Sequence, residues 1–272
     1  MPYLVPAPSD GEELPRNGQV RLQSYNGVHF VVESLVAKSQ NLKVYFQDDR
    51  GKRVQVRKTD FYEDHEGGYG NAVLVVRPER MLAANTTYEL VAEYLAWSRE
   101  KEKEEVWTPV TIATYRTTSE VDREKPRWRA RPTSETREEE DYDRRRKHDV
   151  VLAPVAREHE LLHLVVELAP LGKGKKKRIL LVYDPSRLCP QGPTADYGVA
   201  VANANCPTQG ESGEICHTGT MYDMGKAEDS GRKFRVKLTA VDIAGNKRKA
   251  PGKGPVVRWT GTSITVCLKQ DE

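Results

Sequence analysis

Apolar and polar residues alternate along most of the chain, and this period of two is typical of half-buried β-strands. No segment repeats its apolar residues with the 3.6-residue period of an amphipathic helix. Short clusters of Gly, Asn and Asp separate the alternating segments, as turns between strands do. The pattern predicts an all-β protein with strands near residues 19–25, 28–36, 42–47, 52–58, 71–77, 88–94, 106–116, 149–155, 161–168, 178–183, 234–238, 255–260 and 262–268.

The number and spacing of these segments indicate two domains. Roughly seven short strands in about 120 residues are the sequence signature of two antiparallel sheets packed as a sandwich. The chain of 272 residues contains that number twice, and a charged stretch follows the strand that ends near Thr118. We therefore predict two immunoglobulin-like antiparallel β-sandwiches in tandem, formed by residues 1–121 and 122–272.

Three charged stretches contain almost no apolar residues and are expected to lie at the surface. Residues 133–148 combine acidic and basic runs, which predicts a long exposed loop because they offer nothing to a core. Residues 98–105 have no apolar face and are expected to form a solvated loop or a hairpin tip. The basic run at 173–178 lies between two predicted strands, so it indicates an exposed hairpin tip.

Residues 184–232 form an unusually long connection between two predicted strands. The segment is rich in Gly, Pro, Thr, Asn and Ser, and connections of this length are commonly functional. It contains Cys189, Cys206 and Cys216, and the fourth cysteine of the chain is Cys267. A cysteine-bearing loop of this kind either presents a recognition surface or simply decorates the fold, and both interpretations stay open.

An even number of cysteines that tie down a long loop predicts two disulfides and an oxidising compartment, with four free thiols as the alternative. No Cys-x-x-Cys pair occurs, which argues against a zinc knuckle or a thioredoxin-like redox pair. Among the three possible connectivities we favour Cys189–Cys206 together with Cys216–Cys267. Alternation within residues 264–268 puts the apolar side chains toward the core, so Cys267 is expected to face outward.

Composition and motifs argue against several classes of function. The 43 basic and 40 acidic residues leave a net charge of +3, with no concentrated basic footprint for nucleic acid. No apolar run approaches the ~18 residues of a transmembrane helix. The chain contains no nucleophile elbow, P-loop or dinucleotide-binding motif, and its histidines are scattered. We therefore predict no enzyme activity, no catalytic residue, no metal site and no cofactor.

The first eight residues, Met-Pro-Tyr-Leu-Val-Pro-Ala-Pro, have neither the charged region nor the apolar region of a signal peptide. Two interpretations stay open. Either the protein is cytosolic, or the sequence is a mature form to which a start methionine has been added. The cysteines favour the second interpretation, so we expect a periplasmic, cell-surface or secreted protein.

Residues 76–90, Val-Arg-Pro-Glu-Arg-Met-Leu-Ala-Ala-Asn-Thr-Thr-Tyr-Glu-Leu, resemble a stretch of bacterial immunoglobulin-like domains of the S-layer-associated type. The resemblance implies that Leu82 packs below a corner, that Asn85 makes the turn, and that Tyr88 opens the next strand. It also implies a tyrosine corner, in which the Tyr88 ring is buried and its hydroxyl is tied to the main chain. Residues 115–118, Tyr-Arg-Thr-Thr, are similar to the Phe-x-Thr at that family's end, with Tyr in place of Phe.

Residues 234–246, Phe-Arg-Val-Lys-Leu-Thr-Ala-Val-Asp-Ile-Ala-Gly-Asn, resemble the strand and hairpin of many bacterial immunoglobulin-like and fibronectin type III-like modules. The resemblance implies that Asp242 and Asn246 hydrogen-bond the turn backbone. It also implies that Gly245 adopts a positive φ. Both resemblances concern the fold, because β-sandwiches carry many unrelated functions.

The leading hypothesis is a non-enzymatic structural, adhesive or protein-interaction module of a bacterial envelope or secreted protein. Its partner would be a protein or a cell-surface polysaccharide, contacted through the cysteine-bearing loop and the charged stretch at 133–148. The alternatives are a periplasmic carrier of a small ligand or metal, and an accessory domain of a larger secreted enzyme.

Overall fold

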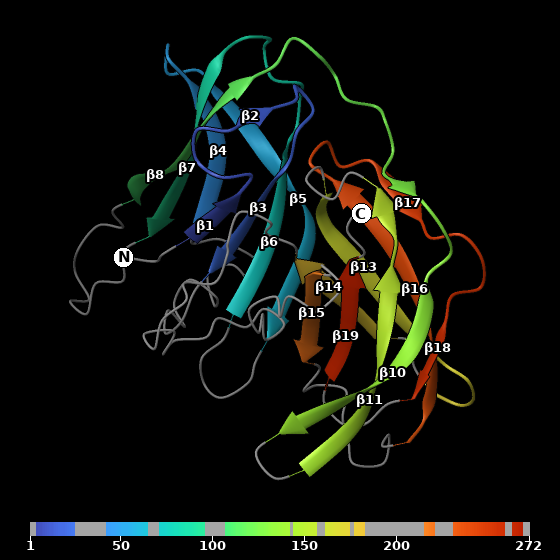
Figure 1. Ribbon diagram of the computed structural model, residues 1–272. Helices are drawn as coiled ribbons and strands as arrows, with labels where there is room; N and C mark the ends of the chain where they lie inside the picture. Colours follow the sequence, from blue (N-terminus) through green and yellow to red (C-terminus); the bar gives the residue numbers. More distant parts are fainter. Residues whose placement is uncertain are drawn as a thin grey trace, which may run out of the picture. The chain divides into compact units, whose positions relative to one another are not determined.

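The protein is described by a computed structural model, shown in Figure 1. The structure describes residues 4–24, 42–64, 71–95, 107–141, 144–156, 161–174, 177–182, 215–220, 231–258 and 263–268. These residues contain nineteen strands and no helix, which confirms the all-β class. The chain divides into two compact units. The first comprises Met1–Glu63, Gly67–Arg123 and Ile243–Gly245, and the second comprises Asp64–Glu66, Glu124–Asp242 and Asn246–Glu272.

The first unit contains eight strands in one continuous sheet with the order β1-β3-β6-β5-β4-β7-β8-β2. Strand β5 spans twelve residues and lies between β6 and β4 in this order, so it belongs to both halves of the sheet. Strand β2 pairs with β8 in parallel. The strands are β1 (Leu4–Ala7), β2 (Glu13–Leu14), β3 (Val20–Ser24), β4 (Leu42–Asp48), β5 (Arg53–Asp64), β6 (Asn71–Pro78), β7 (Thr87–Leu95) and β8 (Trp107–Thr117).

The core of the first unit is built from alternate strand residues, as half-buried strands require. The ring of Phe46 meets the ring of Tyr88 edge-on, with centroids 6.3 Å apart, and that of Tyr115 at 6.5 Å. Such edge-to-face pairs add about 0.5–1.5 kcal/mol beyond the area they bury. The buried cluster comprises Leu14, Val20, Leu22, Val44, Phe46, Val54, Leu74, Val76, Leu82, Tyr88, Leu90, Ala92, Ala113 and Tyr115.

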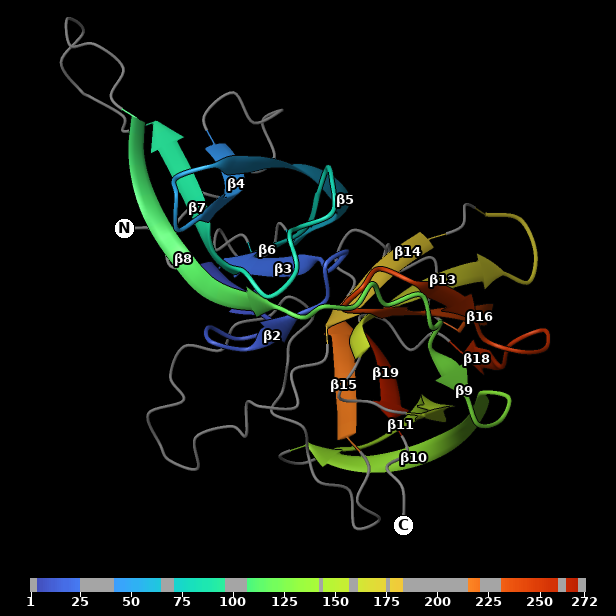
Figure 2. The ribbon, with the colours of Figure 1, turned by 90° about the horizontal axis from the view of Figure 1, so that it is seen from above.

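The second unit contains a four-stranded sheet, β10-β11-β19-β15, and a five-stranded sheet in which β14, β13, β16 and β17 are neighbours and β18 also pairs with β16. Strands β12 and β9 form a separate pair. Figure 2 shows β10, β11, β19 and β15 of the four-stranded sheet from above. The strands are β9 (Arg127–Trp128), β10 (Thr133–Asp141), β11 (Arg144–Ala153), β12 (Val155–Ala156), β13 (Leu161–Pro170), β14 (Lys177–Val182), β15 (Ile215–Thr220), β16 (Lys233–Asp242), β17 (Lys247–Lys249), β18 (Val256–Arg258) and β19 (Ser263–Leu268).

The prediction of a long loop at residues 133–148 is wrong. This segment forms β10 and the first half of β11, which pair as an antiparallel hairpin. Apolar alternation did not reveal these strands because the four registered pairs furthest from the base of the hairpin consist of charged residues rather than core residues.

Two further expectations about the cysteine-bearing region are also corrected. The predicted loop 184–232 contains a strand, β15, which pairs with β19. Cys267 does not face outward, because its side chain is 0% exposed. Val266, Cys267 and Leu268 are all buried. The predicted strand at 28–36 and the predicted loop at 98–105 lie outside the described residues.

Candidate functional site

The most distinctive feature of the described residues is the hairpin formed by β10 and β11, drawn in green in Figure 1. Its register places an acidic block of one strand opposite a basic block of the other. The paired positions are Glu138 with Lys147, Glu139 with Arg146, Glu140 with Arg145, and Asp141 with Arg144. We call these eight residues the charged arm. Directly opposite residues on antiparallel strands are close enough to interact, and opposite charges there stabilise the pairing.

One ion pair of the charged arm is seen directly. The Nζ atom of Lys147 lies 2.8 Å from Oε1 of Glu138, and both side chains are largely exposed, at 70% and 51%. The hydrogen bond to Glu138 raises the pKa of Lys147. An exposed pair of this kind contributes little to stability. This pair therefore holds the register only weakly, and both of its charges are exposed to solvent.

Polar contacts to β18 anchor the base of the hairpin. Asp149 accepts a hydrogen bond from the Thr136 hydroxyl at 2.8 Å through Oδ1, and one from the Arg258 backbone N–H at 2.6 Å through Oδ2. The Ser134 hydroxyl donates to the backbone carbonyl of Val256 at 3.3 Å. Asp149 thus connects three strands just below the first charged pair, so the arm extends from a fixed base.

The base of the hairpin also contacts one of the cysteines, Cys267. Arg137 is ion-paired with Glu135 on the same strand, at 2.5 Å, and its Nη1 atom also donates to Cys267 Sγ at 3.8 Å. Cys267 is fully buried in an apolar cluster with Val150 and Leu152 of β11. In the register of β15 with β19, Cys267 lies directly opposite Cys216. Cys189 and Cys206 lie outside the described residues.

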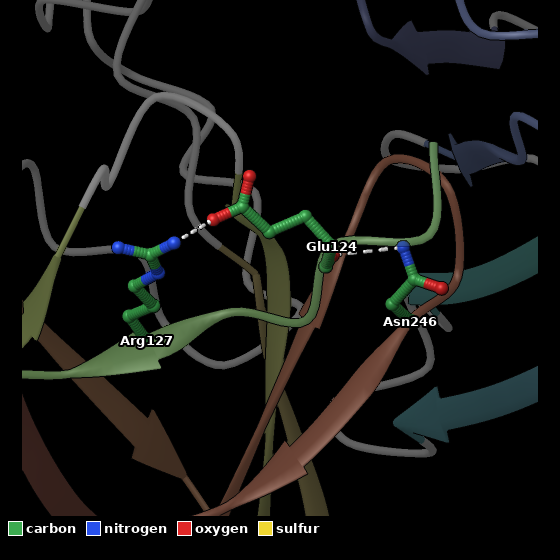
Figure 3. A network of polar contacts seen from close by, with 3 residues as sticks. All are labelled: Glu124, Arg127 and Asn246. Atoms are coloured by element: carbon green, nitrogen blue, oxygen red, sulfur yellow. Dashed lines mark hydrogen bonds and ion pairs between the residues drawn. The ribbon is translucent and has the colours of Figure 1, made fainter. Parts of the chain in front are cut away.

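The turn after β16 is held by the residues that the sequence resemblance singled out. Asp242 is buried and accepts hydrogen bonds from the backbone N–H and the side-chain Nδ2 of Asn246, at 2.8 and 3.1 Å. Gly245 has a φ of +79°, in the left-handed region that favours glycine. Asn246 Nδ2 also donates to the Glu124 carbonyl at 2.9 Å, and the Glu124 carboxylate is ion-paired with Arg127 (Figure 3).

A hollow lies beside this network in the second unit. It is lined by residues that include Glu124, Val155, Leu161 and Asp242, and its volume is about 10 Å³. That is room for about one water molecule. The hollow therefore offers no space for an organic ligand.

Tyr88 closes the corner before β7 in the first unit. Its ring is buried in the core, and its hydroxyl accepts a hydrogen bond from the backbone N–H of Ala83 at 3.0 Å. Asn85 makes the turn with a φ of 49°. Thr117 was not singled out as a site residue from the sequence. Its hydroxyl lies 2.6 Å from the Ala83 carbonyl and accepts the Thr86 N–H at 3.0 Å, so it secures the same corner from β8.

A second polar cluster of the first unit involves Tyr45, Arg53 and Glu93. The Tyr45 hydroxyl donates to Glu93 Oε1 at 2.7 Å, and Arg53 Nη1 lies 3.0 Å from the same oxygen. The Arg53 guanidinium also stacks over the Tyr45 ring at 4.2 Å. Burial, together with the hydrogen bond to Glu93 and its charge, raises the pKa of Tyr45 to about 12, although Arg53 opposes the shift.

The described His, Cys, Asp and Glu residues do not gather into a metal site. Within the described ranges there is no group of three or more His, Cys, Asp or Glu that could hold a metal ion. His163 is buried in β13, whereas His148 lies in β11 opposite Arg137. The same ranges contain no helix long and apolar enough to span a membrane.

The chain matches no protein-family model, and no match was found among curated proteins.

Proposed function

We propose that the chain is a pair of immunoglobulin-like β-sandwiches. In the first unit, the order β1-β3-β6-β5 followed by β4-β7-β8 corresponds to strands A-B-E-D and C-F-G of an immunoglobulin domain. Tyr88 near the start of β7, bonded to the backbone five residues upstream, corresponds to the tyrosine corner of such domains. In the second unit, the presence of a four-stranded and a five-stranded sheet supports the same architecture.

On this scaffold, we propose a non-enzymatic adhesive or protein-interaction module of a bacterial envelope or secreted protein. The observation that carries the proposal is the register of the charged arm, in which four acidic residues of β10 lie opposite four basic residues of β11. The arm adds little to stability, since its visible ion pair is exposed. Two adjacent rows of opposite charge are suited to recognition, because complementary charges raise association rates and exclude wrong partners.

A protein is the favoured partner over a polysaccharide. Strand β10 is the last strand in the order of its sheet, and among the described residues no strand pairs with its outer side. An extended segment of another protein can add to such an edge through main-chain hydrogen bonds. Basic side chains on the added segment would face the acidic row, which gives the interaction its specificity.

The proposal is tested by sedimentation of the purified chain with cell envelopes isolated from the organism that encodes it. In a neutral-arm variant the four acidic residues become Gln or Asn and the four basic residues become Gln. These changes remove four negative and four positive charges, so the net charge stays at +3. The matched control neutralises eight exposed charges of the first unit: Glu12, Glu13, Glu79, Glu89, Arg50, Lys52, Arg57 and Arg116.

The wild-type chain and the control are expected to sediment with the envelopes, and added salt is expected to weaken this binding. The neutral-arm variant is expected to stay in the supernatant. Proteinase treatment of the envelopes should abolish binding if the partner is a protein, whereas a polysaccharide partner would survive it. Equal sedimentation of the wild type and the neutral-arm variant would show that the charged arm does not bind the envelopes.

A further inference from the structure

Strands β15 and β19 bring two cysteines to directly opposite positions. Their antiparallel register pairs Ile215 with Leu268, Cys216 with Cys267, and His217 with Val266. Figure 2 shows the two strands side by side, in orange and red. Opposite residues of an antiparallel pair have Cα atoms about 4.5–5.5 Å apart and Cβ atoms on the same face. This whole range of Cα–Cα distances lies within the range of about 4.4–6.8 Å that a disulfide needs.

We propose that Cys216 and Cys267 form a cross-strand disulfide that fastens β15 to the sheet bearing the charged arm. In forming the bond, the two thiols lose two protons and two electrons. The oxidant is a disulfide of a small thiol or of a protein oxidase, which is reduced to two thiols in the exchange. If all four cysteines are oxidised, this pairing leaves Cys189 and Cys206 as the second disulfide.

Strand β15 is the element that most needs such a fastening. It contains six residues and pairs only with β19 among the described strands. The connection from the end of β14 at Val182 to the start of β16 at Lys233 spans 50 residues (183–232), and β15 is the one described strand within it. A crosslink from Cys216 to Cys267 encloses the end of this connection together with β16, β17 and β18, and it lowers the conformational entropy of that part of the unfolded chain.

The disulfide is also linked to the base of the arm. Cys267 Sγ lies 3.8 Å from Nη1 of Arg137, which stands on β10 four residues before the end of the strand. Val150 and Leu152 of β11 pack around the same sulfur. The bond would thus join β15 to a cluster that includes both strands of the hairpin, so breaking it is expected to loosen β15 first and the hairpin base second.

Peptide mapping without reductant tests the pairing directly. Trypsin leaves Cys189, Cys206 and Cys216 in one peptide, because no Lys or Arg lies between Arg187 and Lys226. Additional cleavage after Glu211 and Glu214 separates Cys216 from the other two. The expected product is a peptide containing Cys216 linked to the tryptic peptide that begins at Trp259 and contains Cys267. A link of either cysteine to Cys189 or Cys206, or alkylation of both in the unreduced chain, would overturn the proposal.

Hydrogen exchange of residues 215–220 tests the consequence. Reduction, or the Cys216→Ser substitution, is expected to raise exchange in β15 by at least about tenfold, because the strand is held to one neighbour only. The control, Cys189→Ser, is expected to leave exchange in β15 within about twofold of the wild type. Unchanged exchange in β15 after reduction would contradict the fastening role. Neither experiment depends on whether the charged arm binds a partner.

Discussion

Lys147 lies directly opposite Glu138 across the β10–β11 hairpin, and its Nζ atom is 2.8 Å from Glu138 Oε1. Lys147 is the last of the four consecutive basic residues of β11, and the buried residues of the same strand begin three positions later, at Val150. On the C-terminal side of Lys147, Val150 and Leu152 pack in a buried cluster and hold β11 in place. In the charged arm, the opposite charges on the two strands favour the observed register.

The first prediction concerns this pair. The Glu138→Lys substitution places two positive charges opposite each other and should increase hydrogen exchange in the arm. The double variant E138K/K147E should restore slow exchange, because it exchanges the partners without changing their attraction. A double-mutant cycle is expected to give a small favourable coupling free energy that falls as salt is added. A coupling of zero at low salt would show that the pair does not help to hold the hairpin.

The second prediction concerns the corner at Tyr88. The Tyr88→Phe substitution keeps the buried ring but leaves the N–H of Ala83 without its acceptor. The free energy of unfolding, measured with urea, should fall by about 1–2 kcal/mol. An unaltered unfolding midpoint would mean that this hydrogen bond does not stabilise the corner.

A third prediction follows from the raised pKa of Tyr45. The folded-state pKa of about 12 lies above the usual value of 10.0. The neutral phenol therefore stabilises the folded state fully below pH ~10, and this contribution is lost as the pH rises through ~12, because the unfolded chain ionises first. The Tyr45→Phe variant should be less stable than the wild type at pH ~8 by about 1–2 kcal/mol.

The difference in stability between these two proteins should then shrink above pH ~10, since only the wild type has this phenol to ionise. Urea unfolding at a series of pH values measures it, and the comparison cancels the titration of the many lysines. A constant difference up to pH ~12 would show that the environment of Tyr45 does not favour its neutral form.

The fourth prediction concerns Gly254, which precedes β18. Its φ is +78°, and a Cβ atom at this position would lie 1.9 Å from the backbone oxygen of Val236. The Gly254→Ala substitution should therefore lower the free energy of unfolding by more than about 2 kcal/mol. Gly252 is the matched control. It also has a positive φ, +83°, but a Cβ there would meet only the Arg131 side chain, at 3.2 Å.

The control substitution Gly252→Ala should cost about 1–2 kcal/mol, from the backbone conformation alone. Equal losses for the two variants in urea unfolding would indicate that the backbone near Val236 moves aside.

Much of the fold was predictable because most strands bury one face. Residues 52–58 and 234–238 alternate, and they contribute to β5 and β16. The shortest strands, such as β2 and β9, contain two residues each and carry no detectable period. The burial of Cys267 was missed because alternation assigns one face to solvent, whereas the consecutive residues Val266, Cys267 and Leu268 are all buried.

The sequence indicated where the candidate site lies, but it did not predict that the site is a β-hairpin. Residues 133–148 were recognised as a charged surface segment, yet a search for apolar alternation cannot detect strands held by opposite charges. The sequence did contain a signal, because four acidic residues are followed, after two intervening residues, by four basic residues, and an antiparallel pairing places these two blocks opposite each other. Thr117 was missed for a different reason, since its hydroxyl acts on a corner 31 residues away in sequence.

We propose that the charged arm recognises a partner through the order of its acidic and basic strands. This proposal is tested most directly by exchanging the two blocks, so that residues 138–141 become Lys-Arg-Arg-Arg and residues 144–147 become Asp-Glu-Glu-Glu. Every pair keeps its attraction and the net charge stays at +3, but the outer strand becomes basic. We predict unchanged stability and loss of sedimentation with envelopes. Binding equal to that of the wild-type chain would contradict the account.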